Sequence, residues 1–278
     1  MGFDFFGVFK MAVIALHSAA TGMTALSTQL DVISNNIANS NNNGFKASRA
    51  SFEDLLYQYQ QLPGAKNELG DTQPVGLGIG YGTRINGTQL DLSQGSMIKT
   101  NEETDICIQG SGFFRVKVPS TQGDGFCYTR SGNFFINSDR KLVCNSRDGY
   151  LLDPEIEVPT DSKGITITQD GRVFSTNAGS ADAQPLGQIQ IAQFRNPQGL
   201  IQVGGNFYQR SDASGDADLA TPGEKGTGTL RQGFLESSNV DPITELINMI
   251  KTQRTFELNS QSIQAADQML QQVNNLRR

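Results

Sequence analysis

Apolar residues recur every seven positions at both ends of this chain. Near the start, one row spaced by sevens and a second row offset by three consist of Leu16, Met23, Leu30 and Ile37, and of Ala19, Leu26 and Ile33. Toward the end, the corresponding rows consist of Met249, Phe256, Ile263 and Leu270, and of Ala266 and Val273. Narrow stripes at this spacing are typical of a coiled-coil seam. We therefore predict two long terminal helices that pair as a coiled coil and leave part of their seam for another molecule.

A stripe at helical spacing more often lines the core of a globular domain. In this chain, however, the stripes lie at the two termini and flank a central region with a different pattern. This placement favours packing between copies of the chain.

Length, charge and hydropathy narrow the classes of protein that need to be considered. A chain of 278 residues has room for about two domains. It carries 28 acidic and 22 basic residues, for a net charge of -6, without the basic stripe that neutralises phosphates. We therefore expect no nucleic-acid partner.

No apolar run approaches a membrane span of roughly 18 to 20 residues, and the run over 11–16 is too short for a signal peptide. We expect export without a cleaved signal.

The N-terminal helix is expected from about residue 13 to residue 38, where a run of Asn and Gly ends it. Residues 1–44 form this N-terminal region, in which residues 1–10 are either an extension or the product of a start codon chosen too early. The next stretch, 45–59, is amphipathic and fits either a second helix or an extended arm. We assign residues 45–100 to a connecting arm.

Within this arm, glycine alternates with larger residues from Gly76 to Gly82. This period of two predicts a strand whose bare face lies against another backbone. The spacing does not match a dinucleotide-binding loop, so we expect no phosphate ligand.

The centre of the chain, residues 101–210, reads as an all-β domain of short strands and turns. Its strongest hairpin signal is the alternating stretch 165–173, where Asp170 and Gly171 suit a type I′ turn. The polar stretch 211–228 reads as loop, and residues 211–239 form a return connection. Asp241 and Pro242 then provide an N-cap and a first helical residue for a C-terminal helical region over 240–278. The predicted fold class is α+β.

An enzymatic function has little support. The single histidine, His17, has no cysteine or carboxylate partner at the spacing of a zinc site. Glu102, Glu103 and Asp105 could act as an acid and base pair, but charged clusters before a strand are usually solvated. We expect no catalytic residue, metal or cofactor.

Three cysteines, Cys107, Cys127 and Cys144, cannot all pair within one chain. Buried thiols in strands would explain them as small apolar side chains. A disulfide between Cys127 and Cys144 would suit an oxidising compartment, and the sequence supplies no geometry for it.

Several motifs resemble a known family. Residues 11–23, 30–39 and 44–46 resemble the N-terminal signature of bacterial flagellar rod and hook proteins, and residues 232–240 and 253–257 resemble its C-terminal signature. Two central motifs, Ile108 to Phe114 and Tyr128 to Gly132, are shared widely within the family. Asn42 stands where this family usually has Thr. Arg140 stands at a turn where it tends to have Gly, which predicts another turn geometry there.

Within the family, one segment resembles the part that distinguishes distal rod subunits from proximal rod and most hook subunits. Its residues are Leu55, Leu56, Tyr57, Pro63, Gly64, Gly76, Gly78 and Gly80.

The resemblance implies a structural subunit of the distal rod of the flagellar basal body. Copies would polymerise into a rigid, hollow helical drive shaft that crosses the periplasm and transmits torque from motor to hook. The partners would be further copies, proximal rod and hook subunits, the surrounding ring proteins that act as a bushing, and the flagellar export apparatus. A proximal rod or hook subunit is the alternative within the family. A secreted coiled-coil adhesin is the alternative from another class; it would usually show a signal peptide and one long terminal coil.

Overall fold

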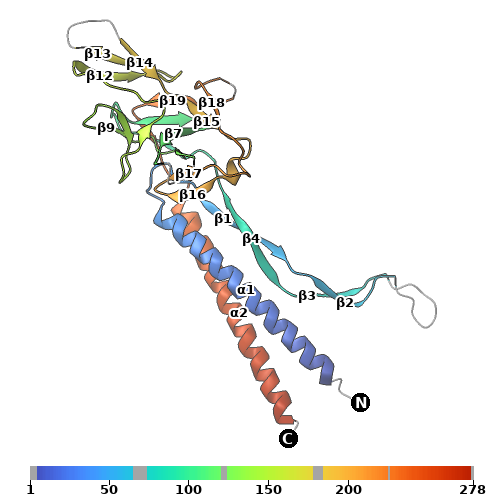
Figure 1. Cartoon of the computed structure of the whole chain (residues 1–278). Coiled ribbons are helices and arrows are strands. Elements are labelled where there is room, and N and C mark those ends of the chain that lie inside the picture. Colours follow the sequence, from blue (N-terminus) through green and yellow to red (C-terminus); the bar gives the residue numbers. More distant parts are fainter. Residues whose placement is uncertain (1–4, 65–73, 120–123, 178–183, 225, 277–278) are drawn as a thin grey trace. The chain divides into compact units, whose positions relative to one another are not determined.

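The computed structural model describes residues 5–64, 74–119, 124–177, 184–224 and 226–276 (Figure 1). These residues form two α-helices, twenty β-strands and one short 3-10 helix, η1 (Pro197–Gly199). They divide into two compact units. The first unit contains the described residues up to 37, residues 48–89 and the described residues from 241 onward. The second contains residues 38–47 and 90–240.

The first unit contains both long helices, α1 (Phe5–Ala38) and α2 (Pro242–Leu276). α1 begins eight residues before the predicted start, and the predicted extension therefore continues the helix over its described part. α2 begins at the predicted residue because Asp241 accepts hydrogen bonds from the Ile243 amide at 3.1 Å and the Thr244 hydroxyl at 2.6 Å. Residues 277 and 278, the last two of the predicted C-terminal helical region, lie outside the described residues.

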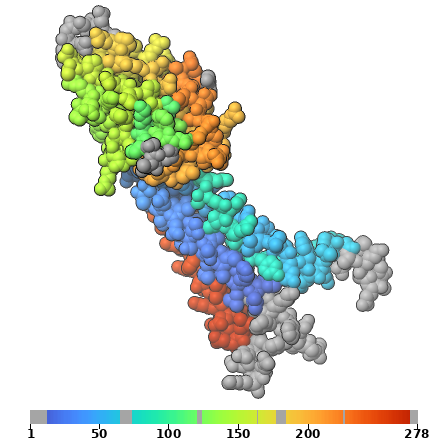
Figure 2. Space-filling model, viewed as in Figure 1, coloured from blue at the N-terminus to red at the C-terminus, as the bar shows by residue number. Residues whose placement is uncertain are grey.

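α1 and α2 run antiparallel and lie side by side (Figures 1 and 2). Near the end of α1, Asn36 is hydrogen-bonded to Glu245 in the first turn of α2. Further back along α1, Gly22 lies against Asn259, whose Nδ2 atom would be 3.4 Å from a Cβ atom built on that glycine. The missing side chain at Gly22 therefore leaves just enough space for the amide of the other helix.

Two short ribbons form the arm of the first unit. β1 (Ser48–Asp54) pairs with β4 (Thr83–Leu90), and β2 (Tyr57–Gln61) pairs with β3 (Leu77–Gly80). Residues 48–54 and 57–61 are thus extended, and the helical alternative for 45–59 is wrong. Asn36 explains how the arm starts, because its side chain donates to the Ser48 carbonyl at 2.8 Å and accepts from the Ser48 amide at 3.0 Å.

The second unit is built around a nine-stranded antiparallel sheet. Its main path is ordered β16-β17-β8-β7-β11-β10-β9, and β15 joins it by pairing with β7 and β18. The nine strands are β7 (Phe113–Lys117), β8 (Phe126–Thr129), β9 (Phe134–Ile136), β10 (Leu142–Cys144), β11 (Leu151–Leu152), β15 (Ile191–Gln193), β16 (Ile201–Gly204), β17 (Phe207–Gln209) and β18 (Asp218–Ala220).

Smaller sheets complete this unit. A three-stranded sheet consists of β12 (Ser162–Ile167), β13 (Arg172–Asn177) and β14 (Gln184–Gln188). Two further pairs join β6 (Ile106–Gln109) to β19 (Thr229–Gln232), and β5 (Met97–Lys99) to β20 (Phe234–Glu236). Hydrophobic side chains from the large sheet and the smaller sheets form the buried core. In the large sheet, Phe114 of β7 and Phe134 of β9 pack edge to face.

The all-β prediction for 101–210 holds only in part, because the β structure extends beyond it. β18, β19 and β20 lie in the stretch that was predicted as loop and return connection. Their partners, β15, β6 and β5, come from earlier parts of the chain. Strands of three or four residues carry little periodic signal of their own, and these depend on distant partners.

The predicted hairpin over 165–173 is confirmed, since β12 pairs with β13 with Ile167 opposite Val173. Its predicted type I′ turn is wrong. That turn needs positive φ at two successive residues, and in this loop φ is positive only at Gly171. The reason is loop length, because four residues, 168–171, separate the two strands.

Arg140 lies in a turn whose backbone conformation suits glycine. Its φ is +61°, in the left-handed region that favours glycine. The turn therefore keeps the backbone that a glycine would adopt, with an arginine held in it.

Candidate functional site

A buried ion cluster lies where the second unit begins and ends in the sequence. The ammonium group of Lys46 is 2.6 Å from Oε1 of Glu236, and the exposed fractions of the two side chains are 0% and 1%. Lys46 also donates to the Ser93 carbonyl at 2.6 Å. Arg130 lies on the other side, with its Nη1 atom 3.5 Å from Glu236 Oε2. Two cations therefore share one carboxylate inside the protein.

Burial opposes the charge on both cations. Removal from water lowers the pKa of Lys46 and of Arg130, and the carboxylate of Glu236 counteracts this shift in each case. The Arg130 guanidinium also lies over the Phe113 ring, 5.2 Å from its centroid. Glu236 is therefore the group that makes burial of two positive charges tolerable.

Backbone contacts around this cluster join three segments distant in sequence. The amide of Gly44 donates to the Glu236 carbonyl at 2.8 Å, and the amide of Gly95 donates to Glu236 Oε1 at 3.0 Å. Asn239 accepts from the amide of Ala47 at 2.8 Å and donates to the Asp91 carbonyl at 2.8 Å. The chain passes between the two units at 37/38, 47/48, 89/90 and 240/241, and the cluster joins segments of the second unit that lie near the last three of these crossings.

The motifs that resemble the flagellar family meet in this cluster. Lys46 comes from the N-terminal motif, Arg130 from a central motif and Glu236 from the C-terminal motif. Gly44 has a φ of +74°, and a Cβ atom there would lie 2.6 Å from the Ser131 amide nitrogen. A glycine is therefore required at 44 both by conformation and by close approach.

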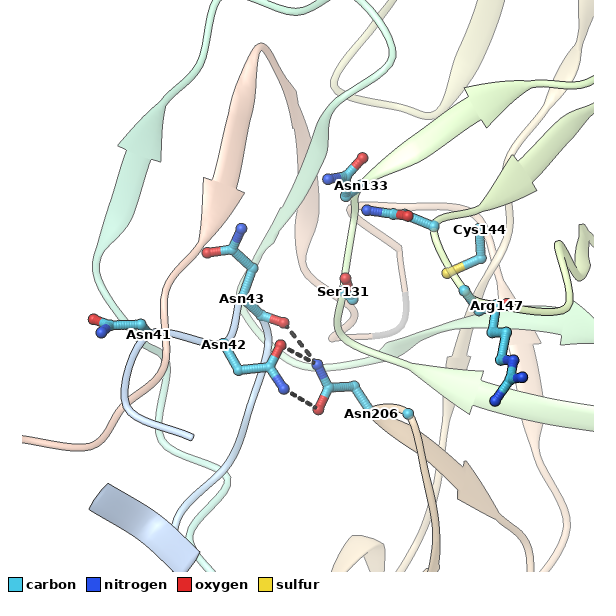
Figure 3. A pocket seen from close by; sticks show the side chains of 11 residues that line it. Asn41, Asn42, Asn43, Ser131, Asn133, Cys144, Arg147 and Asn206 are labelled. Atoms are coloured by element: carbon cyan, nitrogen blue, oxygen red, sulfur yellow. Dashed lines mark hydrogen bonds between the residues drawn. The ribbon is translucent and has the colours of Figure 1, made fainter. Parts of the chain in front are cut away.

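Asn42, which replaces the usual Thr, has a specific role in this unit. Its side-chain amide pairs with that of Asn206, which donates to Asn42 Oδ1 at 2.9 Å and accepts from Asn42 Nδ2 at 3.2 Å (Figure 3). Asn206 also donates to the Asn43 carbonyl at 3.0 Å. The pair fixes the loop that follows α1 against the β16–β17 turn.

A polar pocket of about 370 Å³ lies beside this amide pair (Figure 3). Its lining is dominated by asparagine, with one charged side chain, and consists of Asn41, Asn42, Asn43, Ser131, Asn133, Cys144, Asn145, Ser146, Arg147, Gly205 and Asn206. The side-chain amides that line the pocket can both donate and accept hydrogen bonds. No group of His, Cys, Asp and Glu side chains within the described part of the chain could hold a metal ion.

The predicted rows on α2 point toward α1. Glu245 and Asn259 contact α1 and so mark the side of α2 that faces it. At 100° per residue around the helix axis, Met249, Phe256 and Ile263 project within about 60° of that side. The side chains of Met249, Phe256, Ile263 and Leu270 are half-buried, and Ala266 is buried. Val273 lies within α2, and its side chain is outside the described set.

The two predicted rows on α1 have different surroundings. Ala19 and Ile33 are buried and Leu26 is half-buried, so the offset row faces α2. The row spaced by sevens, Leu16, Met23, Leu30 and Ile37, is half-buried throughout. Gly22 and Asn36 mark the side of α1 that contacts α2. Around the helix axis, Leu16, Met23 and Leu30 project about 100° to 140° away from that side. This row therefore lies on the flank of the helix pair.

The alternating glycines of the arm are covered by tyrosines from the partner strand. Tyr57 pairs with Gly80 and Tyr59 with Gly78, and a Cβ atom at Gly78 would be 3.1 Å from the Tyr59 ring. The expectation that this bare face meets another backbone is therefore wrong at Gly78 and Gly80, whereas Gly76 and Gly82 do lie close to backbone atoms of other segments. Aromatic rings fill the space because a cross-strand aromatic side chain can pack over a glycine.

The remaining residues of the predicted rod-specific segment are mostly accessible. Leu55 is half-buried, and Leu56, Tyr57, Pro63 and Gly64 are exposed. Gly76 is held close to the arm's own backbone, because a Cβ atom there would lie 2.6 Å from the Gln61 carbonyl oxygen. Residues 65–73 of this segment lie outside the described residues.

Gly82 attaches the arm to α1. A Cβ atom at Gly82 would collide with the Thr21 hydroxyl and would lie 3.1 Å from the Ser18 Cα atom. Beside it, His17 packs edge to face against Tyr81, with ring centroids 6.4 Å apart. His17 therefore takes part in a packing contact between helix and arm.

The cysteines are all buried and unpaired. Burial raises the pKa of Cys107 to about 11 and that of Cys144 to about 12. The thiols are therefore protonated at neutral pH and poor nucleophiles.

No helix among the described residues is long and apolar enough to cross a membrane.

Sequence reasoning did not identify the ion cluster. Lys46, Arg130 and Glu236 were each noticed within a motif, but charged residues are usually solvated and nothing local indicated that they meet. The only available signal was the presence of one charged residue in each of three motifs.

Comparison with known proteins gives three family matches. Residues 16–46 match the family described as flagella basal body rod protein. Residues 107–175 match the D1 domain of the flagellar hook protein FlgE/F/G family. Residues 231–276 match the C-terminal family of the flagellar basal body rod FlgEFG proteins.

Individual relatives match over nearly the whole chain. The flagellar basal-body rod protein FlgG of Buchnera aphidicola subsp. Schizaphis graminum is 44% identical over 94% of this chain and 99% of the relative. FlgG of Caulobacter vibrioides is 42% identical, covering 95% and 99%. The flagellar hook-basal body complex protein FlhP of Bacillus subtilis is 30% identical, also covering 95% and 99%.

Proposed function

The chain belongs to the flagellar basal-body rod protein FlgG family and is a structural rod subunit, and we propose that its copies polymerise into the distal rod. The observation that carries this proposal is the identity of 40–44% to FlgG proteins over nearly the full chain. In this assignment the protein is a component of the basal body, not an enzyme, and it transmits torque from motor to hook.

The helices would form the wall of a hollow tube. α1 and α2 would pair as a coiled coil through the offset row of α1 and the rows of α2. The half-buried flank with Leu16, Met23 and Leu30 would be covered by a neighbouring subunit. Contacts between unlike surfaces produce an open helix when the rotation does not close, which suits a shaft.

The arm would give the shaft its stiffness. Its accessible apolar side chains include Leu56, Leu62, Val75 and Leu77. A two-stranded ribbon is marginally stable alone in water, so covering these side chains would stabilise the arm and restrict sliding between subunits. The rod-specific residues, from Leu55 to Gly80, would thereby favour a straight polymer.

The ion cluster would carry load between the helical segments and the β unit. Force passed along the chain from the helical segments enters the second unit at the covalent crossings, and these crossings lie beside segments of the ion cluster. Lys46, Arg130 and Glu236 hold those segments together, so the cluster suits a stiff mechanical joint.

Other partners follow from the proposed position of the subunit in the shaft. Proximal rod and hook subunits would bind its two ends, ring proteins would surround it, and the export apparatus would deliver it across the inner membrane. Exported subunits would pass through the lumen. The family matches favour this function over a secreted adhesin.

Deletion of the gene tests the proposal directly. Cells without the protein should not swim, and their isolated basal bodies should show truncated rods without hooks by electron microscopy. Expression of the intact chain from a plasmid should restore both. Full-length rods with hooks in the deletion strain would refute the proposed function.

A further inference from the structure

Four segments of the second unit enclose the asparagine-lined pocket. They are the loop after α1, the loop after β8, the end of β10 with the loop that follows it, and the β16–β17 turn. Figure 3 shows Asn42 and Asn206 on one side of the pocket and Asn133 and Arg147 on the other. Its volume of about 370 Å³ is within the range of sites for small ligands.

The lining offers hydrogen-bonding groups that the protein itself does not use. Six of the eleven lining residues are asparagines, and only Asn42 and Asn206 pair with each other. The side chains of Asn133 and Asn145 make no hydrogen bond within the described parts of the chain. Pockets for apolar ligands are lined mainly by hydrophobic side chains. This lining therefore fits a ligand that is itself rich in polar groups.

The charge in the pocket is positive. No lining residue is acidic. The exposed side chain of Arg147 has no ion pair among the described residues. A guanidinium group binds a carboxylate through two parallel hydrogen bonds. The pocket therefore suits a polar ligand that carries one carboxylate.

A phosphate group fits this pocket less well. Phosphate sites commonly use the amides at the N-terminus of a helix, where the helix dipole is positive. Here the residues 41–43 follow the C-terminal end of α1, where the dipole is negative. A single guanidinium beside this end matches a carboxylate better than a group with two negative charges.

The backbone around the pocket disfavours an extended peptide. Such a peptide would pair with the free edge of a strand. Cys144 is the only lining residue that belongs to a strand, and its strand, β10, already lies between β11 and β9. Side-chain amides instead suit hydroxyl groups, because both kinds of group donate and accept hydrogen bonds. A carbohydrate presents several such hydroxyl groups close together.

We propose that this pocket binds a sugar that carries a carboxylate group. Arg147 holds the carboxylate, Asn133 and Asn145 bind hydroxyl groups, and the Asn42–Asn206 pair fixes the opposite wall. The inference goes beyond the proposed function and does not depend on it, because the pocket lies within the second unit alone.

Saturation-transfer NMR on the purified full chain tests the ligand class. The probes are glucuronic acid, galacturonic acid and N-acetylneuraminic acid, and their uncharged counterparts are glucose, galactose and the methyl ester of N-acetylneuraminic acid. At least one acidic sugar should bind about tenfold more tightly than its counterpart, because charged hydrogen bonds are the stronger ones. Absence of binding by all three acidic sugars, or equal binding of the counterparts, overturns the proposal. Equal binding of acetyl-alanyl-alanine, a peptide with a carboxylate, would identify a peptide site instead and also overturns it.

Variants of two exposed side chains locate the site. Arg147→Gln should weaken binding of the acidic sugar about tenfold and leave binding of the uncharged one unchanged, whereas Asn145→Leu should weaken both. Circular dichroism checks that the fold is preserved. Arg195→Gln and Asn86→Leu change exposed residues of the same types outside the pocket and should bind like the wild type. Equal effects of pocket and control variants would overturn the site, and rod assembly in cells tests the proposed function separately.

Discussion

The Lys46 ammonium and the Glu236 carboxylate are 2.6 Å apart inside the protein, although 190 residues separate them in the chain. Arg130 shares the same carboxylate. Removing one partner of a buried ion pair leaves an uncompensated charge, which is more damaging than losing an exposed pair.

We expect Lys46→Met to reduce the free energy of unfolding of the second unit by about 3 kcal/mol and Glu236→Gln by about 5 kcal/mol. The larger cost arises because Glu236→Gln leaves two buried cations without a counter-charge. Urea denaturation of the full chain measures both values. Glu102→Gln, at an exposed carboxylate, is the control, and an equal effect of all three variants would contradict the role of the cluster.

Arg140 is expected to be a site where glycine stabilises the protein. Its φ of +61° is unfavourable for a side chain, and Arg140→Gly should raise the free energy of unfolding by about 0.5 to 1 kcal/mol after the entropy cost of glycine. Thermal denaturation provides the measurement. Arg147→Gly, at a nearby exposed arginine that lacks a positive φ, should be destabilising. A loss of stability with Arg140→Gly would disprove the strain.

Glu155 is expected to make the free energy of unfolding depend on pH in the acidic range. Hydrogen bonds from Lys117 and Lys141 lower its pKa to about 2 from the usual 4.5. Its carboxylate is therefore favoured in the folded state, and this contribution is complete above pH 4.5 and is lost as the pH falls toward 2. Urea midpoints between pH 5 and pH 2 should fall less steeply in Glu155→Gln than in the wild type. Parallel curves would exclude this contribution.

The apolar rows are expected to respond to charge. Ile263→Asp puts a carboxylate on the face of α2 toward α1 and should destabilise the helix pair by about 1 to 3 kcal/mol. Leu30→Asp, on the flank, should block assembly with little effect on the monomer. Circular dichroism at 222 nm and swimming assays distinguish the two effects. Normal swimming with either variant would show that its row does not hold the polymer.

The arm is expected to keep the polymer straight. Deleting residues 60–75 removes the tip of the ribbon, including residues outside the described ranges, and should produce curved or polymorphic filaments in electron micrographs. Gly87→Ala is a suitable control, because a Cβ atom there meets nothing within 4 Å. Straight filaments after the deletion would place the source of rigidity elsewhere in the subunit.

Local signals predicted the features that depend on neighbouring residues. Asp241 and Pro242 identified the start of α2 because capping involves only the first turn of a helix. The hairpin with Ile167 opposite Val173 followed from alternation and a nearby turn. The start of α1 was missed because residues 5–12 continue the helix without a capping signal.

Features that depend on distant partners could not be predicted in this way. Tyr59 over Gly78 fills a space that looked bare in one strand, since the sequence does not say which strand lies opposite. The cluster around Glu236 forms only when three distant segments of the chain come into contact. The periodicity of hydrophobic residues within one segment does not indicate such a contact. The exposed side chains of Ile243 and Ile247 on α2 were also overlooked, because the heptad rows lie toward the opposite side of the helix.

The pairing of β6 with β19 and of β5 with β20 has a kinetic consequence. In these pairs Ile108 lies opposite Leu230, and Ile98 lies opposite Leu235. Contacts between such distant residues require a large loop to close before any hydrogen bond forms, and chains rich in them fold slowly. The second unit therefore cannot complete its sheets until residues 229–236 are available. During synthesis these pairs cannot form until more than four-fifths of the chain has been made, so completion of the second unit is a late step of folding.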